Sequence, residues 1–213
     1  MKVIAIDGPA GSGKSTVARA LAARLGLEYL DTGAMYRSVT FAALRQGLDP
    51  AEADAVARLA ERVELSVGPD GVIVDGVDAT TEIRGPEVSR AVSVVAANPA
   101  VRTEMVRRQR EWVAERGGGV LEGRDIGTVV FPDAELKVYL TADPEVRAQR
   151  RSKEVADLDY ETVAADLARR DALDSGRETS PLTEAPDAFV LDTTGLTVEE
   201  ILDVLEQELA KRG

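Results

Sequence analysis

The segment that decides the fold is a glycine-rich stretch near the N-terminus, Gly8-Pro9-Ala10-Gly11-Ser12-Gly13-Lys14-Ser15. It fits the pattern G-x-x-x-x-G-K-[ST]. An apolar strand is expected directly before it, at residues 2–7, and a helix directly after it, at about residues 14–25, where Gly26 ends the helical pattern. Strand, loop and helix in this order are the context in which this pattern forms a phosphate-binding loop.

Each part of this loop suits the binding of a nucleoside triphosphate. Its glycines let backbone N–H groups turn inward around a phosphate, and the start of the helix adds partial positive charge. Lys14 would bridge the β- and γ-phosphates, and the Ser15 hydroxyl would ligate Mg²⁺, the expected cofactor. Asp7 and Asp125 are candidates for the outer shell of that metal. The residues expected to bind ATP here are Gly8, Pro9, Ala10, Gly11, Ser12, Gly13, Lys14, Ser15 and Thr16.

Beyond the loop, apolar runs alternate with helical periodicity, which is typical of a parallel α/β sheet. Strands are expected near residues 28–30, 120–122, 136–141 and 188–192, and helices near residues 34–46, 51–63, 87–97, 100–115 and 198–211. One stretch differs, because residues 64–67 and 72–75 alternate with period two around Gly68-Pro69-Asp70-Gly71. This pattern predicts a β-hairpin, and so a small antiparallel insertion in a parallel α/β domain.

The composition excludes several classes of protein. The chain has 213 residues, no cysteine and a formal net charge of −12, so we expect no disulfide, no thiolate metal site and no basic surface for nucleic acid. It lacks a run of about 18 or more apolar residues and a signal-peptide pattern, so we expect a cytoplasmic protein without a membrane partner. Histidine is also absent, so the chemistry must proceed without imidazole.

Two polar segments follow expected strands. They are Asp31-Thr32-Gly33-Ala34-Met35-Tyr36-Arg37 and Gly123-Arg124-Asp125. Because ligands bind at the carboxyl edge of a parallel sheet, both segments lie where a ligand would be held.

Two further sets of charged residues have helical spacing. They are Arg147, Arg150 and Arg151 in the first set, and Arg170, Asp174 and Arg177 in the second. Each set would share one helix face, although Gly176 interrupts the last turn of the second. Guanidinium groups bind phosphate oxygens bidentately, so both sets suit anionic ligands.

With these residues the chain resembles the cytidylate kinases of bacteria, members of the nucleoside monophosphate kinase group of P-loop proteins. The resemblance spans essentially the whole chain. Its most specific stretches are Asp7-Gly8-Pro9, Asp31-Thr32-Gly33-Ala34-Met35-Tyr36-Arg37, Glu82-Ile83-Arg84, Val101-Arg102, Gln109-Arg110 and Gly123-Arg124-Asp125-Ile126-Gly127-Thr128-Val129-Val130-Phe131-Pro132-Asp133-Ala134. It implies a three-layer P-loop fold with a five-stranded parallel sheet, a small antiparallel β insertion in the acceptor-binding region and a helical lid.

The resemblance also implies an organisation and a reaction. Residues 1–213 would form a single kinase domain, with an acceptor-binding insertion at about 33–118, its small β-sheet at about 63–85 and a lid at about 143–175. The implied reaction is the ATP-dependent phosphorylation of CMP and dCMP to the diphosphates in pyrimidine nucleotide metabolism.

The roles of the acceptor-binding residues come from this resemblance. Arg37, Arg124 and Arg177 would hold the acceptor's phosphate, Arg170 and Asp174 its ribose hydroxyls, and Ser93, Arg102 and Asp125 its base. Cytosine carries an exocyclic amine beside ring acceptors, which a carboxylate and a guanidinium group would match. Thr32 stands where many relatives have serine and keeps the hydroxyl. The full set is Thr32, Tyr36, Arg37, Ser93, Arg102, Gly123, Arg124, Asp125, Arg170, Asp174 and Arg177.

The first arginine set would form a lid over ATP and neutralise charge on the transferring phosphoryl group. Arg150 would bind ATP, and the expected catalytic residues are Lys14, Arg124, Arg147, Arg151 and Arg177. For any single one of these lid arginines the alternative is a solvated helix face paired with Glu145 or Glu154.

The lack of histidine fits this reaction. A phosphate monoester has a second pKa of about 6, so the attacking oxygen is already ionised at neutral pH and needs no general base. Positioning and charge stabilisation would then suffice. Asp31 or Asp125 could instead serve as the base for a hydroxyl acceptor such as shikimate or dephospho-coenzyme A, so a kinase of that kind stays an alternative.

The other alternative is a nucleotide-dependent switch. No guanine-reading Asn-Lys-x-Asp pattern is present, and the number of arginines suits two bound nucleotides rather than one. We expect a monomer with ATP and CMP or dCMP as partners. The preference among CMP, dCMP and UMP stays open.

Overall fold

The computed structural model describes residues 1–154 and 159–212. The chain forms two compact units, one of Met1–Glu28 with Arg116–Gly213 and the other of Tyr29–Glu115. The larger sheet and the smaller sheet expected from the sequence are both present, with five and three strands. The α/β fold class is therefore confirmed.

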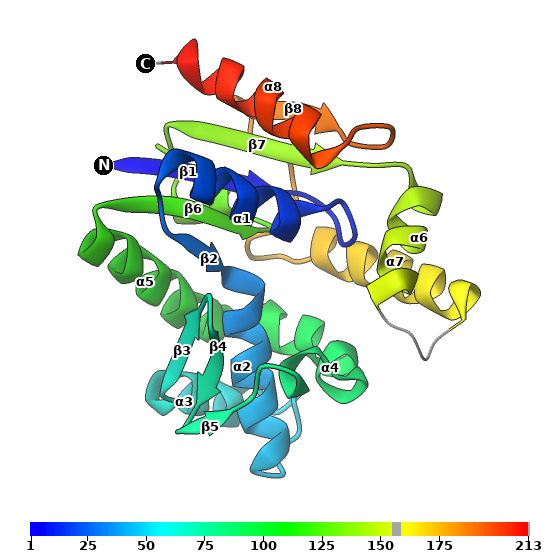
Figure 1. Ribbon diagram of the computed structural model, residues 1–213. Helices are drawn as coiled ribbons and strands as arrows, with labels where there is room; N and C mark the ends of the chain where they lie inside the picture. Colours follow the sequence, from blue (N-terminus) through cyan, green and yellow to red (C-terminus); the bar gives the residue numbers. More distant parts are fainter. Residues whose placement is uncertain (155–158, 213) are drawn as a thin grey trace. The chain divides into compact units, whose positions relative to one another are not determined.

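The larger sheet has the strand order β2-β6-β1-β7-β8 (Figure 1). Its strands are β1 (Lys2–Asp7), β2 (Tyr29–Asp31), β6 (Gly118–Gly123), β7 (Leu136–Thr141) and β8 (Phe189–Asp192). Strand β1 pairs in parallel with β6 and β7, and β7 pairs in parallel with β8. Residues 4–6 of β1 are fully buried, as expected for the central strand of a parallel sheet.

The helices of this first unit are α1 (Lys14–Leu25), α6 (Pro144–Glu154), α7 (Tyr160–Ser175) and α8 (Val198–Ala210). Helix α1 packs against α8, and both lie in front of the sheet in Figure 1. Arg24 near the end of α1 binds Asp203 and Glu206 of α8, at 2.9 and 3.1 Å. A short π-helix, Ile126–Val130, follows β6.

The second unit surrounds α2. Its elements are α2 (Thr32–Arg45), α3 (Ala53–Arg62), β3 (Leu65–Gly68), β4 (Gly71–Val74), β5 (Val77–Asp78), a 3₁₀ turn (Glu82–Arg84), α4 (Pro86–Ala97) and α5 (Pro99–Arg116). Strands β3, β4 and β5 form an antiparallel sheet in that order. Helix α2 packs against α3, α4 and this small sheet.

Element bounds agree with the sequence-based expectations to within a few residues, and three features differ. The predicted hairpin carries a third strand, β5, which is too short to show alternation. The π-helix at Ile126–Val130 was not expected, because its β-branched residues show no helical period. Helix α7 ends at Ser175, so Arg177 lies beyond the helix face predicted for it.

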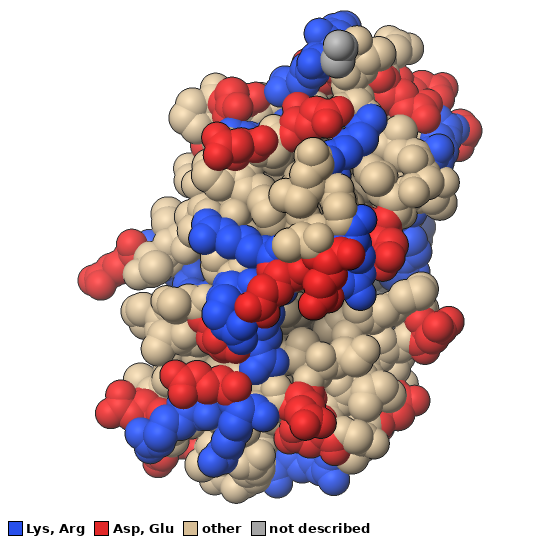
Figure 2. Space-filling view, turned by 90° about the vertical axis from the view of Figure 1, so that its left-hand side faces the viewer, with Lys and Arg blue, Asp and Glu red and all other residues tan. Residues whose placement is uncertain are grey.

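Among the described residues no helix is both long and apolar enough to cross a membrane. Charged side chains of both signs are interspersed over the face seen in Figure 2, so the acidic excess of the chain does not form a single patch there.

Arg108 fixes α5 against α3. Its two terminal nitrogens donate to the carbonyl oxygens of Ala60 and Val63, each at 2.8 Å, and its Nε donates to Glu104 at 2.6 Å. The last carbonyls of a helix have no partner within the helix, so this guanidinium group satisfies the C-terminal end of α3. The contact holds the helix that carries Arg102.

We predict that Arg108→Ala lowers the free energy of unfolding by about 1.5–3 kcal/mol, because it leaves helix carbonyls without a charged donor. The matched control is the neighbouring Arg107→Ala. The Arg107 side chain is 53% exposed and pairs only with carboxylates of its own helix among the contacts recorded for the described residues. That variant should change stability much less than Arg108→Ala does, because exposed ion pairs contribute little. Urea unfolding at neutral pH measures both, and equal losses would refute the capping role.

Candidate active site

The site of the first unit forms at the carboxyl edge of the larger sheet. The phosphate loop follows β1, Arg124 and Asp125 follow β6, and Thr193 follows β8. Parallel strands carry these segments to one edge, which is where ligands bind in open α/β sheets.

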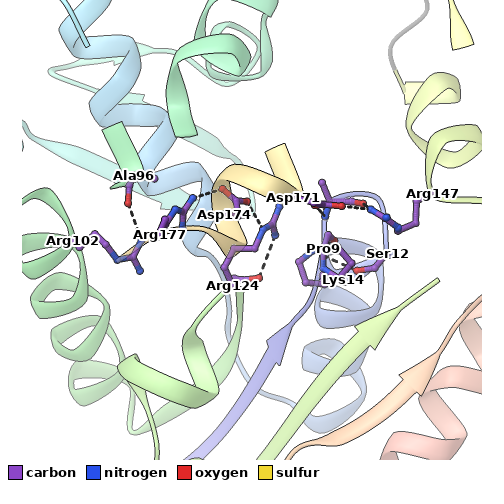
Figure 3. A network of polar contacts seen from close by, with 12 residues as sticks. Pro9, Ser12, Lys14, Ala96, Arg102, Arg124, Arg147, Asp171, Asp174 and Arg177 are labelled. Atoms are coloured by element: carbon purple, nitrogen blue, oxygen red, sulfur yellow. Dashed lines mark hydrogen bonds and ion pairs between the residues drawn. The ribbon is translucent and has the colours of Figure 1, made fainter. Parts of the chain in front are cut away.

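Lys14 lies at the centre of the phosphate loop (Figure 3). Its ammonium group donates to the carbonyl oxygen of Pro9 at 2.7 Å and lies 3.5 Å from the Ser12 hydroxyl. Burial, followed by the nearby charge of Arg124, lowers the pKa of Lys14 to about 7. A bound phosphate would supply the negative charge that keeps this amine protonated.

Asp7 ties the end of β1 to the start of the π-helix. Its two carboxylate oxygens accept hydrogen bonds from the backbone N–H groups of Ile126 and Gly127, at 2.9 and 2.7 Å. Burial raises the pKa of Asp7 to about 6, even though both hydrogen bonds act in the opposite direction. Both oxygens are engaged in holding the segment that carries Arg124 and Asp125.

Asp174 lies among three arginines. Arg124 donates from Nε to Asp174 at 2.9 Å, and Arg177 forms an ion pair with the other oxygen of the same carboxylate (Figure 3). Burial alone would raise the pKa of Asp174, but Arg124 and Arg177 outweigh burial and hold it below its usual range. The structure therefore brings Arg177 to the predicted cluster through an ion pair rather than through a shared helix face.

Arg170 is the third arginine of this cluster. Burial, followed by the charge of Arg124, lowers its pKa to about 10. Within the described ranges, 1–154 and 159–212, its buried Nε atom has no hydrogen-bond partner. Arg151 also contributes to the shift, so the first unit brings Arg151 near Arg170.

The other two lid arginines bind this unit's own backbone and side chains. Arg147 donates to the carbonyl oxygens of Ala10 at 2.9 Å and Ala142 at 3.2 Å. It also pairs with Asp171. Arg150 donates to the hydroxyl and carbonyl oxygens of Thr193, at 2.9 and 2.6 Å. Their position over ATP stays a prediction, as does the alternative pairing with Glu154, whose side chain lies outside the described part of the molecule.

The second unit holds the other predicted acceptor residues. Thr32, Tyr36 and Arg37 lie in the first turns of α2, Ser93 on α4 and Arg102 on α5. All five are buried.

Two clusters form among these residues of the second unit. Arg102 stacks over the ring of Tyr36, 5.2 Å from its centroid, and donates to the carbonyl oxygen of Ala96 at 3.0 Å. Arg37 donates to the carbonyl oxygen of Ile83 at 2.9 Å and to the Ser89 hydroxyl at 3.0 Å. The positions of both guanidinium groups are thus set by contacts within the unit.

Sequence reasoning missed two residues of the first unit that contact predicted ones. Asp171 binds both the phosphate loop and Arg147. The Thr193 hydroxyl lies 3.2 Å from the carbonyl oxygen of Ser12 and 3.0 Å from that of Thr141. Thr193 directly follows the last strand, so the rule that ligands bind at the carboxyl edge could have found it. Asp171 lies within an expected helix region and does not follow a strand, so this rule does not indicate it.

The donor set suits a magnesium ion that arrives with a nucleotide. Among the described residues no three or more carboxylate, histidine or cysteine side chains gather into a metal cage. Ser15 is the second residue of α1, directly after Lys14. Mg²⁺ is usually held by one or two protein oxygens together with substrate phosphates, so Ser15 fits the role of its protein ligand.

The pKa of Asp7 gives a testable pH dependence. An acid whose pKa is raised in the folded state binds its proton more tightly there, so its contribution to stability is full below pH 3.8 and is lost as the pH rises through about 6. The loss is on the order of 3 kcal/mol. We expect ¹³C NMR to place the midpoint of the Asp7 carboxyl near pH 6. A midpoint at or below about 4, the ordinary value for aspartate, would contradict this.

Comparison with known proteins gives the family. The family model described as cytidylate kinase matches residues 4–211. The cytidylate kinase of Mycobacterium avium (strain 104) is 53% identical over 220 residues, covering 99% of this chain and 96% of that protein. The cytidylate kinase of Bacillus subtilis (strain 168) is 46% identical, covering 99% of this chain and 97% of that protein.

Solved structures show the same fold at lower identity. A shikimate kinase from Acinetobacter baumannii has a TM-score of 0.52 at 17% identity, covering 99% of this chain and 94% of that one. A gluconokinase from Sinorhizobium meliloti 1021 has the same TM-score at 14% identity, covering 99% and 92%. These likenesses concern the fold alone. The family model and the full-length relatives show that this chain belongs to the cytidylate kinase family of phosphotransferases.

Proposed function

We propose that this protein transfers the γ-phosphoryl group of ATP to the phosphate of CMP or dCMP, giving ADP and the cytidine diphosphate. The observation that carries the proposal is the group of three arginines, Arg124, Arg170 and Arg177, around the single carboxylate of Asp174. The side chains of Arg124 and Arg177 are only 17% and 6% exposed, and guanidinium groups bind phosphate oxygens bidentately, so this cluster would suit an acceptor phosphate.

The donor side of the reaction uses the phosphate loop. Lys14 would contact the β- and γ-phosphates, and Ser15 with the phosphate oxygens would hold Mg²⁺. The bound metal would neutralise charge on the phosphates during transfer. Arg147 and Arg151 would add charge stabilisation from the lid.

The acceptor needs no activation by a base. Its phosphate oxygen is ionised at neutral pH, because the second pKa of a phosphate monoester is about 6. Arg124 and Arg177 would hold this phosphate for in-line attack, and Asp174 keeps both groups in place. A chain without histidine can therefore carry out the whole reaction.

Base selection is assigned to Ser93, Arg102 and Asp125. A carboxylate accepts a hydrogen bond from the exocyclic amine of cytosine, whereas uracil presents an oxygen in the same place. The stacking of Arg102 on Tyr36 fixes the guanidinium group that would face the base. Arg170 and Asp174 would hold ribose hydroxyls. Both oxygens of Asp174 already accept hydrogen bonds from arginines, so the ribose hydroxyls would donate to the remaining lone pairs of the Asp174 carboxylate.

The assignment of regions is part of the same proposal. Residues 33–118 would bind the acceptor and residues 143–175 would act as the lid, of which residues 155–158 lie outside the described ranges. Closure would exclude water, the competing nucleophile.

The function is tested by steady-state assays with ATP and a panel of acceptors: CMP, dCMP, UMP, AMP and shikimate. We expect turnover with CMP and dCMP to exceed that with AMP and shikimate, because the carboxylate and the guanidinium group are assigned to the amine and the ring acceptors of cytosine. No turnover with CMP together with turnover of shikimate would refute the proposed acceptor. ATP hydrolysis that is independent of every acceptor would favour a nucleotide-dependent switch.

Asp125→Ala tests the reading of the base. We expect kcat/KM for CMP to fall by about tenfold to a hundredfold, with a much smaller change for UMP, because only cytosine donates to this carboxylate. Asp133→Ala is the matched control, since Asp133 is an exposed aspartate in the same segment. Equal losses with both pyrimidines would show that Asp125 supports the phosphate site instead.

A further inference from the structure

Asp171 of α7 connects three parts of the first unit. One of its carboxylate oxygens accepts a hydrogen bond from the backbone N–H of Ala10 at 3.0 Å, and the other forms an ion pair with Arg147 (Figure 3). Arg147 in turn donates to the carbonyl oxygen of Ala10 at 2.9 Å. Asp171, Arg147 and the Ala10 peptide therefore form a closed ring of polar contacts between α6, α7 and the phosphate loop.

Apolar packing supports the same arrangement. Ala10 packs in a buried cluster with Ala148 of α6 and with Val163 and Leu167 of α7. Next to it the backbone of Arg147 approaches Gly11 so closely that a Cβ atom there would lie 2.8 Å from the Arg147 carbonyl oxygen. The loop thus packs against both helices, and the polar ring lies beside a surface with little freedom to move.

The ion pair within this ring is shielded from solvent. The side chains of Arg147 and Asp171 are 13% and 18% exposed. A partly buried, charge-assisted hydrogen bond fixes the direction of a guanidinium group more firmly than an exposed pair does. Arg147 is also held from a third side, by the carbonyl oxygen of Ala142.

Asp171 also acts on the charges at the centre of the site. Burial lowers the pKa of Lys14, and the charge of Asp171 acts in the opposite direction. Asp171 also favours the charged form of Arg124. A carboxylate so near the phosphate loop opposes the binding of an anionic nucleotide, so its presence calls for a function that outweighs this cost.

We propose that Asp171 is a positioning residue for phosphoryl transfer. By holding Arg147 against the Ala10 peptide, it sets where this arginine meets the phosphoryl group that leaves the loop. A displacement of about 1 Å at a reacting group can cost on the order of a hundredfold in rate, so the anchor of Arg147 matters as much as its charge. The inference rests on the proposed function, in which Arg147 stabilises the transferring phosphoryl group.

The test is a double-mutant cycle of Asp171→Asn and Arg147→Ala, measured as kcat with CMP and as the Kd for ATP in the absence of acceptor. Asparagine keeps an acceptor for the Ala10 N–H but loses the ion pair. We expect Asp171→Asn to lower kcat by about tenfold or more while the Kd for ATP changes by less than about threefold. In the Arg147→Ala background the same substitution should cause no further loss, because the partner is gone.

Three further variants separate positioning from folding. Asp166→Asn is the matched control, because Asp166 lies on the same helix and forms an exposed pair with Arg169 at 2.9 Å. It should leave kcat unchanged. Asp171→Glu keeps the charge, so it should recover part of the kcat lost in Asp171→Ala. Thermal unfolding monitored by circular dichroism should show that all variants are folded at the assay temperature.

Three results would overturn the proposal in different ways. A full loss of kcat on adding Asp171→Asn to Arg147→Ala would mean that Asp171 acts through another group. Tighter ATP binding with an unchanged kcat would make Asp171 an internal anion that ATP displaces. An unchanged kcat in Arg147→Ala alone would show that Arg147 does not stabilise the transferring phosphoryl group. The proposed CMP kinase activity is tested separately, by the panel of acceptors.

Discussion

The site of the first unit depends on burying positive charge beside a loop that also needs positive charge. Burying a cation is unfavourable unless it is paired, and this unit buries Lys14 and leaves the side chains of Arg124 and Arg177 only 17% and 6% exposed at one edge of its sheet. Asp174 and Asp171 compensate part of that charge. Burial, followed by the charge of Arg124, lowers the pKa of Lys14 to about 7, and a bound phosphate would favour its charged form.

Contacts between distant segments create this arrangement. Asp7 holds the segment that carries Arg124 and Asp125, more than a hundred residues further along the chain. Asp174 brings Arg177 back to the cluster after the helix has ended. Carboxylates from other parts of the chain therefore hold the arginines in place, and Asp174 does so in addition to the role proposed for it at the ribose.

Distance along the chain partly explains which parts were predictable. The phosphate loop, β1 and α1 follow from a local pattern, because the glycines, the lysine and the helix start lie within one short stretch. The hairpin follows from its alternation. The strand β5 and the π-helix did not follow, since the first is too short for a period and the second has the β-branched composition of a strand. Asp171 was not predictable, because its importance comes from a contact with Ala10, more than 130 positions away. Thr193 contacts Ser12 at a similar distance in sequence, but its place directly after a strand could have indicated it.

The contact between Thr193 and Ser12 has a consequence for the order in which the molecule can be built. The loop is synthesised before Asp171 and Thr193, yet Asp171 accepts a hydrogen bond from its Ala10 N–H and the Thr193 hydroxyl lies 3.2 Å from its Ser12 carbonyl oxygen. Strand β1 likewise cannot pair until β6 and β7 have been synthesised. Contacts so distant in sequence make folding slow and leave apolar strands exposed in the meantime. The nascent chain therefore lacks these contacts of the phosphate loop until Thr193 has emerged, and a product that stops before Asp171 would lack both of them.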